Sequence, residues 1–413
     1  MSNLRLVLPL AVLLTLAASG CGSTSKTISD CSLPGSTKCG TPPVCVNLQE
    51  DQLNCGACGA ACAVGKACLA GACTATCAPP LTKCGTGAAA VCADTASDAA
   101  HCGTCGNSCA VGLDCDRGTC RWTAHRFTSC GATGAVGPTQ AACDTAYAGT
   151  GLAGKVVVTA GIQEWVAPAA GNYRIEAFGA QGHSATDNFL GGQGARVGGD
   201  FALTAGQVLQ ILVGQPGSRV SAAQCNGGGG GGTFVVDKAT ASALVVAGGG
   251  AGTRVAASQN GCAGRVTDLG GLGSGTAAGG LPSTPTFFAC GPRPAGSAGT
   301  GGASSGGGSW GSGGGGMTGN GADDSPYGKG GLAFANGGAG GAGGGCGATS
   351  EGPGGFGGGG AGDGCCGGGG GGGYSGGEGG YIAGGGGSFN GGTNPVNTPG
   401  ANPGAGFATI DPL

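Results

Sequence analysis

Short apolar and aromatic runs, each bounded by turn-forming residues, recur through the second half of the chain and predict a β-rich fold. They are rich in Val, Ile, Leu and aromatic residues, which is typical of strands buried on one or both faces. Frequent Gly, Pro, Asn and Thr between the runs favour a two-sheet sandwich of the jelly-roll type. We predict strands at Val156–Val158, Ile162–Val166, Tyr173–Phe178, Phe201–Leu203, Val208–Val213, Phe234–Val236, Leu244–Ala247 and Phe407–Ile410.

The connections between these runs carry further expectations. Residues 167–172 contain Pro, Gly and Asn, and residues 204–207 contain Thr and Gly; we predict that both are hairpin connections. We expect the large aromatic residues Trp165, Tyr173 and Phe178 to lie in the core of the sandwich.

Between these strands the pattern gives way to glycine, which supplies 105 of the 413 residues. Residues 227–232 and 367–373 are glycine alone. Such runs bury almost no apolar surface and lose much backbone entropy on ordering. The strict Gly-X-Y period of collagen is absent, but extended helices of three residues per turn, bonded laterally through their backbones, remain open to glycine. Because a strand follows this stretch, we predict a glycine bundle inserted into the sandwich.

The N-terminus has the pattern of a secretion signal. Arg5 precedes an apolar run, Leu6–Leu16, that is too short to span a bilayer. The residues Ala18-Ser19-Gly20-Cys21 resemble the bacterial lipoprotein cleavage box, in which the cysteine is acylated. We therefore predict a signal at residues 1–20, a lipidated Cys21, and a polar tether at residues 21–30. The alternative is an ordinary cleaved signal followed by an incidental cysteine.

The 25 cysteines divide into one near the N-terminus, sixteen in two repeats and eight beyond. The repeats cover residues 31–73 and 77–120, and six cysteines of each share the same spacing. Units this small cannot bury enough apolar area to fold without staples. Together with export, this favours disulfides over zinc, the alternative for the C-x-x-C pairs at Cys55–Cys58 and Cys102–Cys105. The repeats resemble the plant stigma-specific cysteine-rich family, which implies little about function.

Beyond the repeats, Cys130 and Cys143 are expected to form a local disulfide, and Cys346 is expected to pair with Cys365 or Cys366. Cys225, Cys262 and Cys290 supply the other partners. The cysteines predicted to be in disulfides are Cys31, Cys39, Cys45, Cys55, Cys58, Cys62, Cys68, Cys73, Cys77, Cys84, Cys92, Cys102, Cys105, Cys109, Cys115, Cys120, Cys130, Cys143, Cys346 and Cys365.

Several stretches from residue 127 to the C-terminus carry a resemblance. They include FTSCGATGAVGPTQAACDTAY from Phe127, LVVAGGG from Leu244 and GGFGGGGAGDGCCGGGGGGGYSGG from Gly354. These resemble the extracellular glycine-rich domain of the anaplastic lymphoma kinase and leukocyte tyrosine kinase receptors. The resemblance implies a tumour-necrosis-factor-like sandwich with inserted polyglycine helices that binds small secreted protein ligands. It also implies ligand-binding roles for Tyr374 and, less directly, Glu378; alternatively, Tyr374 packs against the glycine bundle.

Signals for catalysis are weak, and we expect no enzyme activity. The chain has no kinase motif, and the G-x-S-x-G matches at Ser309 and Ser375 are expected by chance among so many glycines. We expect no cofactor and no metal site, although the adjacent acids Asp323 and Asp324 are considered for a cation.

Composition narrows the choice of function. Only 9% of residues are charged and the net charge is −3, so nucleic acid is not an expected partner. We predict an exported protein anchored by its N-terminal lipid to a bacterial outer membrane or cell surface. It would act as a binding module for an extracellular protein or glycan, with Trp310, Tyr327 and Phe334 either filling the edge of the bundle or forming an aromatic binding surface. The alternative is a structural surface or matrix protein without a specific ligand.

Overall fold

The chain forms two compact units with a boundary between Ala93 and Asp94, which falls inside the predicted second cysteine repeat. Residues 1–30, which include the predicted signal, the tether and Cys21, lie outside the described residues. The computed structural model describes residues 31–413 apart from residues 32–35, 41–42, 52, 64–65, 76, 78–79, 87–89, 110–113, 122–124, 186–188, 219–225, 255–259, 275–289, 305–309, 326, 344–351 and 363–366.

The cysteine repeats consist of short antiparallel hairpins held by disulfides. The paired strands are β1 (Ser36–Cys39) with β2 (Val44–Asn47), β3 (Lys66–Leu69) with β4 (Ala72–Ala75), β5 (Thr82–Cys84) with β6 (Val91–Ala93), and β7 (Asp114–Asp116) with β8 (Thr119–Arg121). The disulfides are Cys31–Cys45, Cys39–Cys58, Cys55–Cys68 and Cys62–Cys73 in the first repeat, and Cys77–Cys92, Cys102–Cys115 and Cys109–Cys120 in the second. Cys84 and Cys105 are also disulfide-bonded. The expectation of a disulfide-rich N-terminal region is confirmed.

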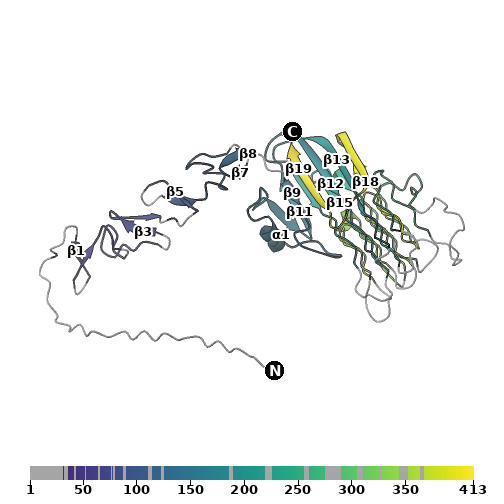
Figure 1. Cartoon of the computed structure of the whole chain (residues 1–413), viewed down its shortest axis with the longest axis horizontal. Coiled ribbons are helices and arrows are strands. Elements are labelled where there is room, and N and C mark those ends of the chain that lie inside the picture. The colour runs from purple at the N-terminus through teal and green to yellow at the C-terminus, as the bar shows by residue number, and fades with distance from the viewer. Residues whose placement is uncertain are drawn as a thin grey trace, which may run out of the picture. The chain divides into compact units, whose positions relative to one another are not determined.

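The rest of the described chain is mainly β and is built around two antiparallel sheets (Figure 1). One has the order β10-β11-β14-β15-β16-β17 and the other the order β18-β13-β12-β19-β9. The strands of the first sheet are β10 (Val156–Thr159), β11 (Ile162–Val166), β14 (Val208–Leu212), β15 (Thr233–Asp237), β16 (Ser242–Ala247) and β17 (Phe389–Asn390). Those of the second are β18 (Thr393–Asn402), β13 (Gly194–Leu203), β12 (Gly171–Phe178), β19 (Phe407–Pro412) and β9 (His125–Phe127). A strand is present at each of the predicted positions, and β19 lies between β12 and β9.

Both predicted hairpin connections are wrong. Residues 167–172 lead from β11 in the first sheet to β12 in the second, and residues 204–207 lead from β13 back to β14. The two connections hydrogen-bond to each other, because the N–H of Ala167 donates to Gln207 and the N–H of Gly206 donates to Ala167, both at 2.8 Å. They therefore bridge the sheets at one end of the unit. A true hairpin joins β10 to β11, where Ala160 and Gly161 adopt positive φ.

The main core lies between the sheets and contains Trp165 and Tyr173, which are 1% and 2% exposed. Phe178 is not in this core, contrary to expectation. Tyr173, Ile175 and Ala177 point inward, so the period of two along β12 places Phe178 on the outer face. There its ring stacks on Phe407 at a centroid distance of 4.0 Å.

Among the described elements that the sequence did not predict are a helix, a 3-10 helix and an edge strand. The helix α1 (Gln140–Ala146) is capped by the Thr139 side chain, which accepts a hydrogen bond from the N–H of Ala142. A one-turn 3-10 helix, η3, covers Phe334–Asn336. Strand β18 is mostly exposed and contains two prolines, which suit an edge strand. No helix in the described part of the chain has the length and apolar character needed to cross a bilayer.

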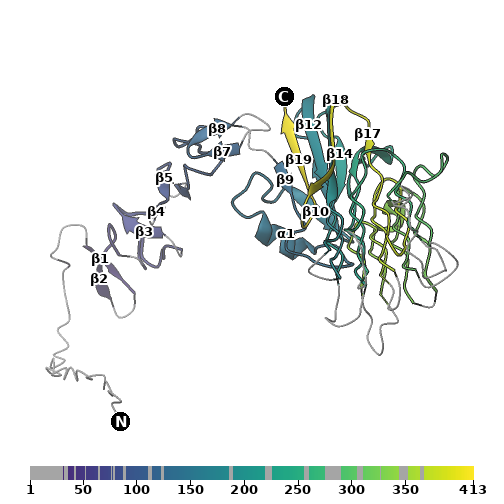
Figure 2. The same ribbon diagram turned by 45° about the vertical axis from the view of Figure 1, so that its right-hand side comes forward.

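Extended glycine segments pack beside the sheets, where Figure 2 shows them as long parallel traces. We call them the glycine body, which comprises residues 226–232, 248–252, 311–316, 354–362, 367–373 and 384–387. Their backbones hydrogen-bond to one another. Along a segment, every third N–H donates to the same neighbouring segment. Gly229 and Gly232 donate to Gly360 and Gly357, whereas Gly230, between them, donates to Gly250. Each segment is thus bonded to more than one neighbour, which compensates for the missing hydrophobic side chains.

The spacing in the glycine body leaves no room for a side chain. A Cβ on Gly231 would lie 1.7 Å from the carbonyl oxygen of Phe356, and one on Gly314 would lie 2.1 Å from that of Gly371. Because backbones approach this closely, glycine is required by packing at these positions and not merely by conformation.

Candidate functional site

Tyr374 leaves the glycine body at the end of the run 367–373 and turns back onto the first sheet. Its ring stacks on Phe389 of β17 at a centroid distance of 4.9 Å and packs against the second core cluster, which contains Leu212 and Phe234. The side chain is half-buried. The alternative was packing against the glycine bundle; the ring instead packs against β17 and the second core cluster, which leaves only part of it exposed.

Glu378, four residues after Tyr374, is held in place by an ion pair with Arg293. Its Oε1 lies 3.6 Å from Nε of Arg293, and its Oε2 accepts a hydrogen bond from the N–H of Gly273. Arg293 also donates to the carbonyl of Gly376. Burial lowers the pKa of Arg293, and the nearby Glu378 carboxylate opposes that shift. Glu378 therefore positions this loop and neutralises Arg293, and most of its carboxylate is not free for a ligand.

Three residues further along, Tyr381 is the centre of a cluster that sequence reasoning missed. The guanidinium of Arg254 lies over its ring at 3.6 Å from the centroid, and the ring of Trp310 lies 6.2 Å away. All three side chains are half-buried, and we call them the Tyr381 cluster. A cation over an aromatic face contributes about 0.5–2 kcal/mol, so the group is held in place while part of it faces solvent. The sequence signal was an aromatic residue in a short interruption of the glycine run, Tyr381-Ile382-Ala383.

The other aromatic candidates do not join this cluster. Phe334 is 7% exposed and stacks on Phe234, so it belongs to the second core. Tyr327 is half-buried, and its N–H donates to the carbonyl of Asp324. Of the three residues proposed as fillers or as a binding surface, only Trp310 lies beside another surface aromatic residue.

The structure assigns structural roles to the groups considered for chemistry. The hydroxyl of Ser375 is buried, accepts from the N–H of Gly299 and donates to the carbonyl of Asp268. Asp323 forms a 2.7 Å ion pair with Lys329, whereas the buried Asp324 accepts from the N–H of Gly311. Ser309 lies outside the described residues.

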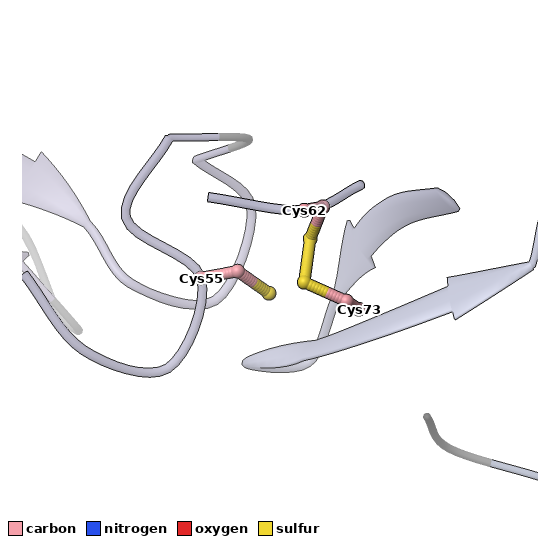
Figure 3. Close-up of side chains that lie close together, drawn as sticks. All are labelled: Cys55, Cys62 and Cys73. Carbon is pink, nitrogen blue, oxygen red and sulfur yellow. A yellow bond between two sulfur atoms is a disulfide. The ribbon is translucent and has the colours of Figure 1, made fainter. Parts of the chain in front are cut away.

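Two groups of cysteine sulfurs are close enough to suggest a metal centre. The sulfurs of Cys55, Cys62 and Cys73 lie within 4.8 Å of one another, as do those of Cys102, Cys109 and Cys120. Figure 3 shows that Cys62 and Cys73 are joined to each other, and Cys55 is joined to Cys68. A sulfur in a disulfide is not a thiolate and cannot serve as a zinc ligand of the usual kind. These groups are disulfide clusters.

The remaining cysteines anchor the second unit. Cys130 is bonded to Cys143 of α1, and Cys262 is bonded to Cys290. The expected pairing of Cys346 with Cys365 or Cys366 lies outside the described residues, as does Cys225.

Comparison with known proteins gives a partial answer. No family model matches the chain. The chain is 40% identical over 95 residues to the leukocyte tyrosine kinase receptor of the mouse, Mus musculus. These residues make up 22% of this chain and 11% of the receptor. The chain thus spans about a tenth of the receptor's length. The similarity is between part of this protein and one segment of that receptor.

Proposed function

We propose that this is an exported, lipid-anchored, non-catalytic binding protein whose second unit recognises an extracellular protein through the Tyr381 cluster. The observation that carries the proposal is the Arg254–Tyr381 contact at 3.6 Å, a half-exposed cation and aromatic pair on an otherwise glycine-rich surface. Tyr, Trp and Arg are the residues most enriched among the energetically dominant positions of protein interfaces. The similarity to a receptor segment supports the same class of function.

The glycine body supplies the rigidity that such a site needs. We infer that its segments are left-handed extended helices with three residues per turn, inserted into a jelly-roll sandwich like that of tumour necrosis factor. The three-residue repeat in donor direction supports this helix type. A platform fixed in this way orders few side chains on binding, so less of the interaction energy is lost to conformational entropy.

The N-terminal region fits the role of an anchor and stalk. Disulfides in both repeats are typical of oxidising compartments outside the cytoplasm. Acylation of Cys21 would attach the chain to a bacterial outer membrane or cell surface, because two or more acyl chains anchor a protein stably. The two repeats would then hold the binding unit away from the bilayer.

The binding role is tested with the full chain immobilised and exposed to proteins released from the surfaces of neighbouring cells. Captured proteins are identified after chemical cross-linking. The Tyr381→Ala variant is expected to weaken capture by about thirtyfold, the effect of losing a dominant interface residue of about 2 kcal/mol. Tyr327→Ala is the matched control, since Tyr327 is also half-buried but lies outside the cluster. Capture that is equal for all three proteins would contradict the assignment of the Tyr381 cluster.

The anchor is tested separately. Metabolic labelling with a fatty acid is expected to mark the wild-type protein and not Cys21→Ser, and the variant is expected to leave the membrane fraction. Equal labelling of both proteins would show that Cys21 is not the acylated residue.

A structural role without a ligand is the second candidate. The observation that favours it is the density of backbone bonding and burial in the glycine body, which would make a stiff coat component. Under this function, deletion of the gene weakens the cell surface, and no protein is captured in a Tyr381-dependent manner.

A further inference from the structure

A pocket of about 360 Å³ opens at the end of the second sheet. No residue of the Tyr381 cluster lines it, and none of the roles described above accounts for it. It is lined by residues of β12, β13 and β18 and by Leu413. The lining residues are Asn172, Asp200, Phe201, Ala202, Thr393, Asn394 and Leu413. Pockets of this size hold small ligands, and a few fixed polar groups in them set the specificity.

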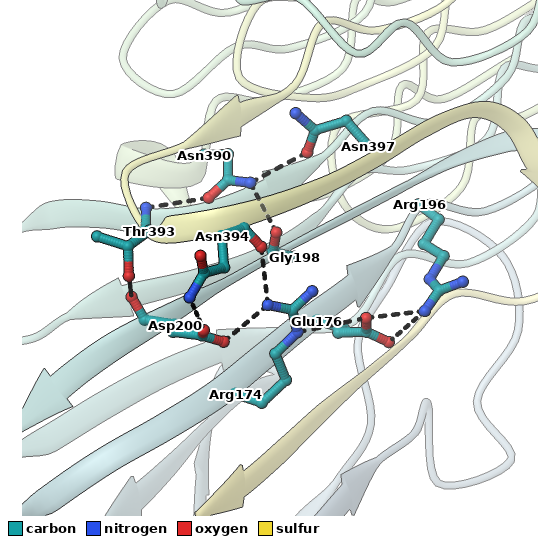
Figure 4. Close-up of polar contacts among 10 residues, drawn as sticks. Arg174, Glu176, Arg196, Gly198, Asp200, Asn390, Thr393, Asn394 and Asn397 are labelled. Carbon is teal, nitrogen blue, oxygen red and sulfur yellow. Dashed lines mark hydrogen bonds and ion pairs between the residues drawn. The ribbon is translucent and has the colours of Figure 1, made fainter. Parts of the chain in front are cut away.

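The acid in this pocket is fixed by its neighbours. Asp200 is 16% exposed, and its Oδ1 accepts a 2.7 Å hydrogen bond from Nη1 of Arg174. Its Oδ2 accepts a 2.7 Å hydrogen bond from Nδ2 of Asn394. Figure 4 shows the two donors on either side of the carboxylate. Since each carboxylate oxygen has a further lone pair, Asp200 remains able to accept hydrogen bonds from a ligand.

The loop that carries Asn394 is also fixed. Nη1 of Arg174 donates to the backbone carbonyl of Asn394, whose φ of 48° is in the left-handed region. Just before it, Oδ1 of Asn390 accepts from the N–H of Gly392, and its Nδ2 donates to the carbonyl of Gly198. These contacts preorganise the loop before any ligand arrives.

Two amides in the pocket have hydrogen-bonding capacity to spare. Within the described residues, neither the side chain of Asn172 nor Oδ1 of Asn394 makes a hydrogen bond. An amide both donates and accepts, which matches a hydroxyl group, and a carboxylate accepts from one. Ala202 and the exposed Leu413 add apolar atoms to the lining of the pocket. The ring of Phe201, which follows Asp200 on β13, packs instead against the main core and beside Gly392.

The charges in the pocket argue against a metal ion and against an anionic ligand. The single carboxylate is already paired with Arg174, so the pocket has too few anionic ligands for Ca²⁺. An anionic ligand would meet the negative charge of Asp200 in the lining of the pocket. A molecule with several neutral hydroxyl groups matches the amides and the carboxylate, and its C–H groups match Ala202 and Leu413.

We propose that this pocket binds one neutral sugar ring, either a free sugar or the terminal residue of a glycan. The site is independent of the Tyr381 cluster, so the protein would have a saccharide site in addition to its protein-binding face.

The test uses the full chain and a panel of sugars as probes: the free monosaccharides and methyl glycosides of glucose, galactose, mannose and N-acetylglucosamine, with sialic acid as the anionic member. Binding is measured by ligand-observed NMR and titration. At least one neutral probe is expected to bind with a millimolar Kd, in the range of about −4 kcal/mol. Methyl glycosides that bind as well as the free sugar would indicate a glycan terminus, whereas binding of the free sugar alone would indicate a monosaccharide.

Two variants locate the site. Asn394→Gly removes the amide while preserving the left-handed backbone, and Asn172→Ala removes an exposed side chain that supports no other described contact. Each is expected to weaken binding by about tenfold, the equivalent of 1.4 kcal/mol. Thr398→Ala, exposed on the same strand outside the pocket, is the control and leaves binding unchanged. Absence of binding by every neutral probe, binding of sialic acid alone, or binding unaffected by both variants would overturn the proposal.

Discussion

Gly250 lies so close to Gly192 that a methyl group on its Cα would be centred 1.7 Å from the carbonyl oxygen of Gly192. The N–H of Gly250 meanwhile donates to the carbonyl of Ala180 at 2.9 Å. The backbone of Gly250 is therefore hydrogen-bonded to Ala180 and in close contact with Gly192. It cannot move away from an added Cβ without breaking the hydrogen bond.

Gly250→Ala is accordingly expected to destabilise the second unit by about 3 kcal/mol or more, at the upper end of the cost of overpacking. Gly171→Ala is the matched control, because the nearest atom to its added Cβ is a Tyr173 ring carbon at 3.8 Å. That change is expected to alter the free energy of unfolding by less than about 1 kcal/mol. Denaturant unfolding of both variants measures the difference, and equal stabilities would contradict the close packing described for the glycine body.

The adjacent acids Asp323 and Asp324 are expected to respond differently to truncation. Asp324→Ala leaves the buried N–H of Gly311 without its acceptor and should cost about 1–3 kcal/mol. Asp323→Ala breaks an exposed ion pair with Lys329 and a part-buried hydrogen bond from the N–H of Gly330, and should cost about 1 kcal/mol, less than Asp324→Ala. Thermal unfolding measures both, and Asp324→Asn, which retains an acceptor oxygen, should recover much of the loss. A larger effect at Asp323 than at Asp324 would be inconsistent with this assignment.

The cysteine repeats should be sensitive to reductants and insensitive to chelators. Replacing both Cys55 and Cys68 by Ser removes one disulfide and is expected to cost about 2–5 kcal/mol. Limited proteolysis of residues 31–120 should accelerate in this variant and in dithiothreitol, but not in EDTA. Protection that disappears on adding EDTA would instead indicate bound metal.

The carboxyl of Asp200 should titrate at an unusually low pH. Hydrogen bonds from Arg174, and then from Asn394, hold the pKa of Asp200 below its ordinary value. A lowered pKa in the folded protein means that this carboxylate stabilises the fold above its unfolded pKa of about 3.9. The contribution is lost as the pH falls through the folded value. Carboxyl ¹³C NMR should show the shift in the wild type and a smaller shift in Arg174→Gln; the same pKa in both would exclude Arg174 as its main cause.

The strands that could be predicted from the sequence are those that contain several apolar side chains. Runs such as Val208–Val213 and Phe234–Val236 predicted their strands, because β-branched and aromatic residues mark buried strands. Strand β18 escaped notice, since its sequence, TNPVNTPGAN, is polar and contains two prolines. An exposed edge strand needs neither an apolar pattern nor every backbone donor.

The errors have physical causes as well. Residues 167–172 and 204–207 have the composition of tight turns. The same residue types also occur in connections between strands of different sheets, as here. Composition alone cannot show that Ala167 and Gly206 bond to each other. Phe178 was placed in the core on its aromatic character, although the alternation from Tyr173 through Ile175 to Ala177 already assigned it to the other face.

The candidate site was the least predictable part. Tyr374 and Glu378 were selected by resemblance, and the structure shows both engaged in packing or ion pairing. The contact of Arg254 with Tyr381 joins residues that are distant in the chain, so no periodicity links them. The pocket around Asp200 likewise depends on strand register, which places Thr393 of β18 opposite it.

The three-residue repeat of bonding in the glycine body has a consequence for how this protein can evolve. An interior position that admits only a hydrogen atom cannot drift, so new specificity cannot arise by gradual remodelling from within. Side chains can be exchanged more readily at the rim, at positions such as the half-buried Trp310 and Tyr381. The glycine interior would then stay unchanged while the residues at its rim are substituted.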